Sequence, residues 1–262
     1  MRRYLALFWL QLRTSVLLAM QYRVDFFLDV LIEIVWASTS LVPLFVVFGA
    51  RGSIAGWTYA EALLVVGWFT LLMGVIEGAI NPSLTTVVEH VRSGTLDFVL
   101  LKPADSQFLV STARFQPSRV VNAITAAVLF GYGFHLLGRW PTPLGVATSL
   151  LLFALASATL YSLWVLTVSA AFYVVRIDNL TFLFSAVFDA ARWPSSVFRG
   201  ALKVFFTFVV PLALMTTYPA EALLGRLDVR SLAQSVGCAA LFLVVSRLVW
   251  VRAVARYTSA SS

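Results

Sequence analysis

Charged residues are scarce in this chain of 262 residues. They make up 12% of the sequence, well below the roughly 25% found in soluble domains. The single cysteine, Cys238, excludes an intrachain disulfide, and with only two histidines the chain offers no spacing typical of a metal site. We therefore predict that the chain is not a soluble domain and that it binds no metal ion.

Nucleotide-binding and catalytic motifs are missing as well. No G-x-x-x-x-G-K loop is present, so the chain is not expected to hydrolyse ATP itself. H-E-x-x-H and G-x-S-x-G are also absent. The net charge of +7 is not carried by a basic run interleaved with stacking aromatic residues, so a nucleic acid is not expected as a partner. We predict no catalytic residue, no cofactor site in this chain and no enzyme activity.

Apolar residues, in contrast, make up 60% of the sequence. Several runs exceed the ~20 residues that a helix needs to cross the hydrocarbon of a bilayer. The sequence therefore predicts one all-α integral membrane domain over residues 1–262 with six transmembrane helices. These spans are expected at residues 26–48, 59–80, 117–137, 144–174, 201–218 and 231–251. Pro211 predicts a kink in the fifth span, and the tight turn at 138–143 predicts that the third and fourth spans are antiparallel neighbours.

Residues 1–22 are apolar at helical spacing but are interrupted by polar side chains. We interpret them as a helix that lies in the headgroup region before the first span. The alternative is a true span, which Arg13 near its middle disfavours, because a central arginine costs about 3 kcal/mol on insertion scales.

The basic residues indicate how the spans are oriented. With six spans and both termini on one side, that side receives most of the nineteen lysines and arginines. The positive-inside rule makes it the cytoplasmic side. On this topology the polar segment 83–103 and the region 176–203 both face the cytoplasm.

The segment 83–103 is a polar island between apolar runs. An apolar stripe at helical spacing is formed by Leu84, Val87, Val88 and Val91. Glu89 and Arg92 fall away from that stripe, and Gly94 is expected to end the helix. The pattern fits a short helix lying flat on the membrane, a helix docked on a soluble partner, or an ordinary solvated loop.

Residues 177–191 form a second unusual region, because they are apolar yet too short for an ordinary span. They include Asp189 and are followed by Arg192, before a break expected at Pro194. We interpret the region as an interfacial or partly embedded helix.

A few ionisable residues fall inside the expected spans, namely Glu33, Glu77 and Arg247. Such residues are candidates for function by default. Each lies near a cytoplasmic end in the topology above, so a structural ion pair or snorkelling is the favoured interpretation. Gly74 and Gly78 beside Glu77 form a small-xxx-small pair that would let another helix approach closely.

The run V-R-S-G-T-L-D-F-V-L-L-K-P, from Val91 to Pro103, resembles the cytoplasmic signature of ABC exporter permeases of the ABC-2 type. The N-terminal helix, the six spans, the internal termini and the chain length are similar to that family too. The resemblance implies an ABC-2 (type V) exporter transmembrane domain over nearly the whole chain. The Leu-Lys-Pro ending is similar to a bacterial subgroup in which two different permeases often serve one ATPase, which implies the bacterial inner membrane as location.

The resemblance also implies a mechanism and partners. Two permease subunits, identical or homologous, would enclose a pathway above two separate ATPase subunits that hold ATP and Mg²⁺. Residues 1–22 would be the elbow helix, and residues 83–103 would form the coupling region. The ATPase-coupling residues implied in this way are Val88, Glu89, His90, Val91, Arg92, Gly94, Thr95, Leu96 and Asp97. Asp189 and Arg192 would supply a second cytoplasmic contact.

The implied pathway lies along the first, second and fifth spans. Its lining would be largely apolar, with Phe205, Phe206, Phe208 and Pro211 as examples. Such a lining suits export of a hydrophobic drug or a lipid-like substrate better than of a small ion. The alternative function is a secondary transporter driven by an ion gradient, with Glu33 or Glu77 as proton carrier and no partner ATPase.

Overall fold

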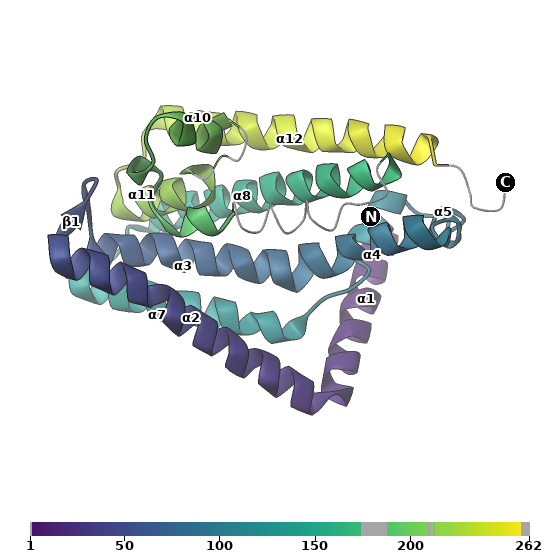
Figure 1. Ribbon diagram of the computed structural model, residues 1–262, viewed down its shortest axis with the longest axis horizontal. Coiled ribbons are helices and arrows are strands. Elements are labelled where there is room, and N and C mark those ends of the chain that lie inside the picture. The colour runs from purple at the N-terminus through teal and green to yellow at the C-terminus, as the bar shows by residue number, and fades with distance from the viewer. Residues whose placement is uncertain (1, 174–187, 209–210, 212, 258–262) are drawn as a thin grey trace.

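The computed structural model describes residues 2–173, 188–208, 211 and 213–257 (Figure 1). The described chain is helical apart from loops and one short hairpin, in which β1 (Ser53–Ile54) pairs antiparallel with β2 (Trp57–Thr58). The longer helices are α1 (Arg2–Gln21), α2 (Arg23–Arg51), α3 (Tyr59–Val75), α4 (Asn81–Ser93), α7 (Val120–Leu137), α8 (Pro143–Ser169) and α12 (Val229–Ala255). The shorter ones are α5 (Asp97–Leu100), α6 (Ser106–Ser111), α10 (Ala201–Phe208) and α11 (Tyr218–Leu224). Single turns are η1 (Ile76–Ile80), η2 (Pro117–Arg119), η3 (Ala170–Phe172), η4 (Asp189–Arg192), η5 (Ser195–Val197) and η6 (Ala213–Thr217).

The long helices run back and forth between two ends of the molecule. One end, here the hairpin end, carries the β1–β2 hairpin and the loops that lead into α8 and α12 (Figure 1). The opposite end, here the α4 end, carries α4, α5 and both chain termini (Figure 1). The two termini therefore lie on the same side of the bundle, as the sequence predicts.

Five helical segments of the described chain are long and apolar enough to cross a membrane. They are Arg23–Ala50, Tyr59–Ser93, Pro117–Leu137, Pro143–Phe172 and Val229–Ala255. They correspond to the first, second, third, fourth and sixth expected spans. The chain is thus an all-helical, multi-pass membrane protein, and the prediction of six spans is confirmed for five.

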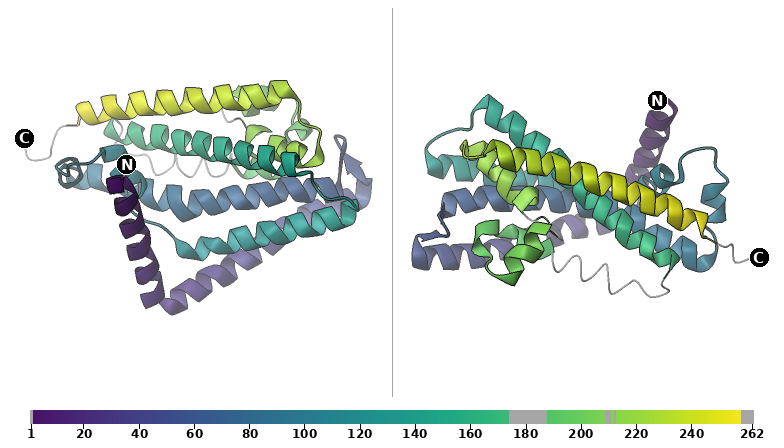
Figure 2. Two further views of the ribbon diagram at one scale, coloured as in Figure 1. Left: turned by 180° about the vertical axis from the view of Figure 1, so that it is seen from behind. Right: turned by 90° about the horizontal axis from the view of Figure 1, so that it is seen from above.

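The fifth expected span, residues 201–218, is not a single long helix. Ala201–Phe208 forms the eight-residue α10, and Ala213–Thr217 forms a π turn that leads directly into α11. Pro211 lies between them, so the kink predicted there is instead a division into separate short helices. These helices gather at the hairpin end (Figures 1 and 2).

The second expected span does not end at Pro82 as predicted. Tyr59–Ser93 is one continuous helix of 35 residues, with a length of about 52 Å at 1.5 Å per residue. The hydrocarbon is only about 30 Å thick, so α4 extends beyond it as a prolongation of the span. The interpretation of this segment as a helix lying flat on the membrane is therefore wrong.

The π turn η1 explains how the helix passes Pro82. A proline inside a helix has no N–H for the carbonyl four residues earlier, and its ring crowds that carbonyl. Here the Asn81 N–H donates to the Ile76 carbonyl, one residue further back than in an α-helix. The Gly78 carbonyl, which Pro82 cannot satisfy, accepts a hydrogen bond of 2.8 Å from the Gln116 N–H.

The main helix pairs are α3 with α7 and α8 with α12, with α11 also against α8 (Figure 2). The prediction that the third and fourth spans are neighbours is wrong, because α7 packs on α3 whereas α8 packs on α12 and α11. A short turn joins α7 to α8, but it does not decide their partners. The fit between the faces of packed helices decides which helices pair.

Glycines on α3 and α7 let these two helices approach closely. A Cβ at Gly74 would lie 3.0 Å from Asn122 Cβ, and one at Gly78 would lie 3.2 Å from Arg119 Cβ. On α7, a Cβ at Gly133 would lie 3.2 Å from the Ala60 carbonyl oxygen. The expected close approach at the Gly74 and Gly78 pair is confirmed.

The predicted topology is wrong for one group of basic residues. It placed Arg192, Arg199 and Lys203 on the same side as α4, but η4, η5 and α10 lie toward the hairpin end (Figure 2). Trp193, for example, packs against the cluster around Leu44, Phe48 and Leu63 near that end. The excess of basic residues at the α4 end is therefore smaller than counted. Of the helix expected at residues 177–191, the part from 177 to 187 lies outside the described residues.

The helix predicted over residues 1–22 is confirmed by α1, which covers Arg2–Gln21. Its direction differs from that of the spans. It crosses the long axis of the bundle at a steep angle and meets α2 at a sharp corner (Figure 1). Large side chains on its outer face are exposed, Trp9 to 66% and Leu5 to 62%. Such a placement is that of a helix lying in a membrane interface.

The packing of α3 on α7 gives a first prediction. Gly133→Ala puts a methyl group against the Ala60 carbonyl and Leu64 and is expected to lower the melting temperature of the purified protein. Gly131→Ala, two residues away on α7, meets open space and is expected to keep or raise it, since alanine is up to about 1 kcal/mol better than glycine in a helix. Equal shifts for the two variants, measured by thermal unfolding in detergent, would contradict this packing.

Candidate functional site

The turn between α4 and α5 is fixed by local hydrogen bonds. Gly94 ends α4 with a φ of +68°, as predicted. The Thr95 N–H then donates to the His90 carbonyl at 3.0 Å. The side chains of His90 and Thr95 are hydrogen bonded at 2.8 Å between Nδ1 and Oγ1, and the Ser93 hydroxyl lies 2.7 Å from the same Thr95 oxygen. Leu96 is fully buried and anchors the turn to the bundle.

The outer side of this turn is exposed and carries both charged and large apolar side chains. Glu89, Arg92 and Lys102 are exposed. Phe98 is exposed to 70% and Leu101 to 80%. We call the exposed residues Glu89, Arg92, Phe98, Leu101 and Lys102 the tip. It lies at the extremity of the α4 end, beyond the hydrocarbon by the length argument above (Figure 1).

The inner side of α4 is firmly packed. Leu84 and Val87 are fully buried, and Val88 and Val91 pack at the edge of the same core cluster. Residues named from the resemblance thus divide into two groups. Val88, Val91 and Leu96 hold the segment on the bundle, whereas Glu89 and Arg92 face outward.

The segment 104–117, which leads from the tip back to α7, is bonded to five helices, among them α2, where Asp29 accepts from Gln116 at 3.1 Å. Ser83 on α4 donates to the Arg114 carbonyl and accepts from the Arg114 N–H at 3.1 Å. On α8, the Tyr161 hydroxyl bonds with Gln107 at 3.0 Å and with Ser111 at 2.7 Å. The segment that follows the tip is therefore tied to more than one helix.

α12 is joined to this segment by an ion pair. Arg247 Nη2 lies 2.5 Å from Asp105 Oδ2, and Arg247 Nη1 donates to Gln107 at 2.8 Å. The hydrogen bond from Arg247 lowers the pKa of the Asp105 carboxyl. Asp105 also caps α6, accepting from the Phe108 N–H at 3.0 Å. Of the two interpretations given for Arg247, snorkelling or a structural ion pair, the structure shows the ion pair, and the sequence did not indicate its partner.

α1 is also bound to segment 104–117. Its inner face presents Tyr4, Phe8, Gln11 and Ser15, which recur at helical spacing. Tyr4 accepts from the Asp105 N–H at 3.3 Å, and Ser15 accepts from the Phe115 N–H at 3.1 Å. Thr112 donates to Gln11 at 2.5 Å. The sequence predicted an interfacial helix here but no contact for these positions.

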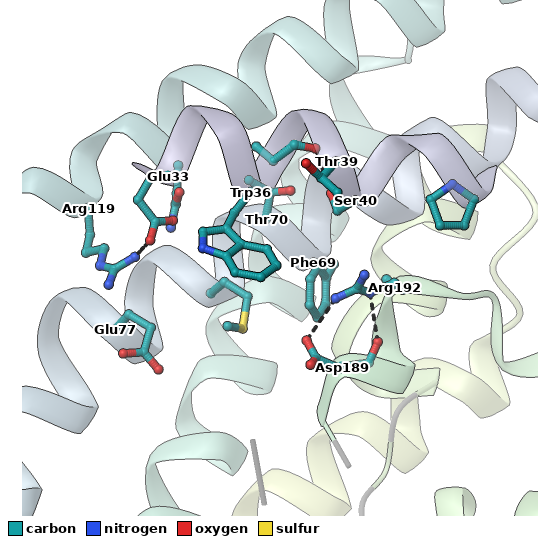
Figure 3. A pocket seen from close by; sticks show the side chains of 14 residues that line it. Glu33, Trp36, Thr39, Ser40, Phe69, Thr70, Glu77, Arg119, Asp189 and Arg192 are labelled. Atoms are coloured by element: carbon teal, nitrogen blue, oxygen red, sulfur yellow. Dashed lines mark hydrogen bonds and ion pairs between the residues drawn. The ribbon is translucent and has the colours of Figure 1, made fainter. Parts of the chain in front are cut away.

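A cavity of about 520 Å³ opens between α2, the α3–η1 helix, the start of α7 and η4 (Figure 3). Its lining includes Glu33, Glu77, Asp189 and Arg192, four residues that the sequence assigned to two separate places. Asp189 and Arg192 therefore lie beside α3 and not at the tip. The tertiary structure brings them to the two intramembrane carboxylates.

Two ion pairs stand at opposite ends of this cavity (Figure 3). Glu33 pairs with Arg119, and each of these side chains is 20% exposed. Asp189 pairs with Arg192 at 2.9 Å, and the Arg192 guanidinium lies 5.4 Å from the centre of the Phe69 ring. A Glu33 carboxylate held by arginine is poorly suited to carry protons. Within the described residues, no group of histidine, cysteine, aspartate and glutamate could hold a metal ion.

Comparison with known proteins gives one family. The model of a family described as "ABC-2 family transporter protein" matches residues 34–261, which is most of the chain. No curated protein and no solved structure gives a significant match.

The ion pair on α12 gives a prediction with a defined pH dependence. Because the folded pKa of Asp105 is lowered, the stability that it contributes is present above its ordinary value near 3.9 and is lost as the pH falls through the folded value. Asp105→Asn keeps a good helix cap but removes the ion pair. At pH 7 the variant is expected to melt lower by an amount that corresponds to at most about 1 kcal/mol, because both side chains are partly exposed.

Acid should then affect parent and variant differently. On lowering the pH from 5 to 3, the parent is expected to lose more melting temperature than Asp105→Asn. Asp25→Asn, which changes an exposed carboxylate at the start of α2, serves as control and should behave like the parent. An identical acid loss in parent and Asp105→Asn would contradict the assignment.

Proposed function

The chain belongs to the ABC-2 transporter family, and from that premise we propose that it is the permease subunit of an ATP-driven exporter. In this proposal it forms the pathway with a second permease, identical or homologous, and works with two copies of a separate ATPase subunit. ATP and Mg²⁺ are bound by that ATPase. The substrate is a hydrophobic or lipid-like molecule moved out of the cytoplasm or the inner leaflet of a bacterial inner membrane.

The tip is the observation that carries the proposal. Exposed large apolar side chains in water-facing loops mark sites of protein association, and Phe98 and Leu101 are exposed to 70% and 80%. Glu89, Arg92 and Lys102 are exposed on the same segment of the chain and add charges of both signs. Apolar side chains accompanied by polar ones are the usual composition of a protein interface.

The continuity of α3 with α4 supports a mechanical role for the tip. A helix of 35 residues that joins the tip to the hairpin end moves as a lever when its cytoplasmic end is displaced. The bonds of segment 104–117 to α1, α8 and α12 extend the same displacement to those helices. ATP-driven closure of the ATPase pair would thereby change the access to the cavity beside α3.

Export of an apolar or amphiphilic substrate is supported by the composition of the spans. The described part of the chain exposes large apolar side chains along α2, such as Phe27 to 68% and Phe45 to 68%. A solute that carries many charges would find few partners among these helices. In membrane vesicles that contain the full complex, ATP-dependent movement of lipid-like compounds, and none of hydrophilic solutes, is the expected result.

The tip yields the direct test. Phe98→Asp together with Leu101→Asp is expected to reduce co-purification with the partner ATPase by at least tenfold, because two apolar contacts become charged. The melting temperature of the isolated permease should stay unchanged, since both side chains are exposed. Charge reversal of Glu89 and Arg92 is expected to weaken the complex less strongly.

The matched control is Val229→Asp, which introduces the same charge at an 83% exposed position at the hairpin end. It should leave co-purification intact. If the double tip variant retains both its ATPase partner and the stimulated ATPase rate, the tip is not the docking element.

A further inference from the structure

We propose that the cavity beside α3 binds an amphiphile with a single positive charge, and that Glu77 is the residue that receives this charge. The inference rests on the proposed transport function and names its substrate class. Three observations support it, namely the size of the cavity, the aromatic side chains in the cavity wall and a carboxylate without a basic partner.

The cavity has the dimensions of a small-molecule site. Its volume of about 520 Å³ falls within the roughly 300–1,000 Å³ usual for ligand pockets. It lies among the middle turns of α2 and the second half of α3, at the depth of the membrane-spanning segments. A ligand there is in reach of the bilayer as well as of the pathway.

The walls suit a bulky apolar body. Trp36 from α2 and Phe69 from α3 stand in the middle of the cavity, between the two ion pairs (Figure 3). Met73 adds a flexible apolar side chain, which adapts to ligands of different shape. The exposed Trp36 face also attracts a cation, by about 0.5–2 kcal/mol depending on desolvation, whereas the Phe69 ring already lies beside the Arg192 guanidinium.

The charges of the cavity do not balance. Two of its three carboxylates have arginine partners, Glu33 with Arg119 and Asp189 with Arg192. Among the described residues, no basic side chain lies within ion-pair distance of Glu77, whose hydrogen-bond partner is the Asn81 amide at 3.2 Å. An ionised Glu77 therefore leaves one negative charge without a counterion among the described residues.

An uncompensated carboxylate at this depth favours a cationic ligand. Ionisable side chains within spans are costly and are usually paired, and the attraction between two charges grows as the surroundings become less polar. A ligand cation supplies the partner that the protein lacks. The cavity also contains a buried nitrogen, Arg119 Nε, without a hydrogen-bond partner, but the charge of that guanidinium is already matched by Glu33.

Two probes of the same shape and opposite charge can test this inference. Tetraphenylphosphonium and tetraphenylborate are measured for binding to the full chain in lipid nanodiscs, with empty nanodiscs as the correction for partition into lipid. Tetraphenylphosphonium is expected to bind saturably, and Glu77→Gln to weaken it at least tenfold. Tetraphenylborate is expected to show no saturable binding to the parent.

The choice of variants separates a loss of cation binding from a loss of folding, and the assay does not depend on the ATPase. Glutamine retains the shape of Glu77 and its bond to Asn81, and Asp25→Asn removes a carboxylate outside the cavity and should leave binding unchanged. Cation binding that survives Glu77→Gln overturns the inference, and so does equal binding of both probes. Because no ATPase is present in the assay, a failure here leaves the proposed exporter function intact, whereas loss of ATPase docking leaves this binding intact.

Discussion

The hydrogen bond from the Gln116 N–H to the Gly78 carbonyl is the contact on which the architecture depends. In a bilayer, each backbone polar group must find a partner inside the protein, and Pro82 deprives the Gly78 carbonyl of its own. The bond from Gln116 supplies that partner, and the π turn makes room for the proline ring. The second span can then continue into α4 and carry the tip beyond the membrane.

The same contact determines where the cavity forms. Arg119 can lie close beside η1 because Gly78 has no side chain, since a Cβ there would lie only 3.2 Å from Arg119 Cβ. Arg119 then pairs with Glu33 on α2, while Glu77 remains on the neighbouring wall. The close packing of α7 on α3 and the charge pattern of the cavity thus have one origin. α2 contributes only its inner turns, and its remaining surface is exposed to lipid.

The tip and the cavity are connected by one continuous helix. The α3–η1–α4 helix carries Phe69 and Glu77 in the cavity and Glu89 and Arg92 at the tip. Segment 104–117 adds a second connection, since it begins near the tip and ends in the η2 turn that holds Arg119. In the proposed exporter, an ATPase that moves the tip would change the shape of the cavity that contains Glu77, and hence the binding of a charged substrate.

The sequence by itself determined that this is a helical membrane protein, most of its span boundaries, the end of α4 at Gly94 and the resemblance to ABC-2 permeases. These properties follow from apolar length, glycine conformation and a local motif, all of which act over a few neighbouring residues. Only the tertiary structure decided the rest. It paired Arg247 with Asp105 and Arg119 with Glu33, moved Asp189 and Arg192 to the cavity, separated α7 from α8, and replaced the fifth span by short helices. Such contacts join residues up to 142 positions apart, and they depend on which helix faces meet, which no local pattern encodes.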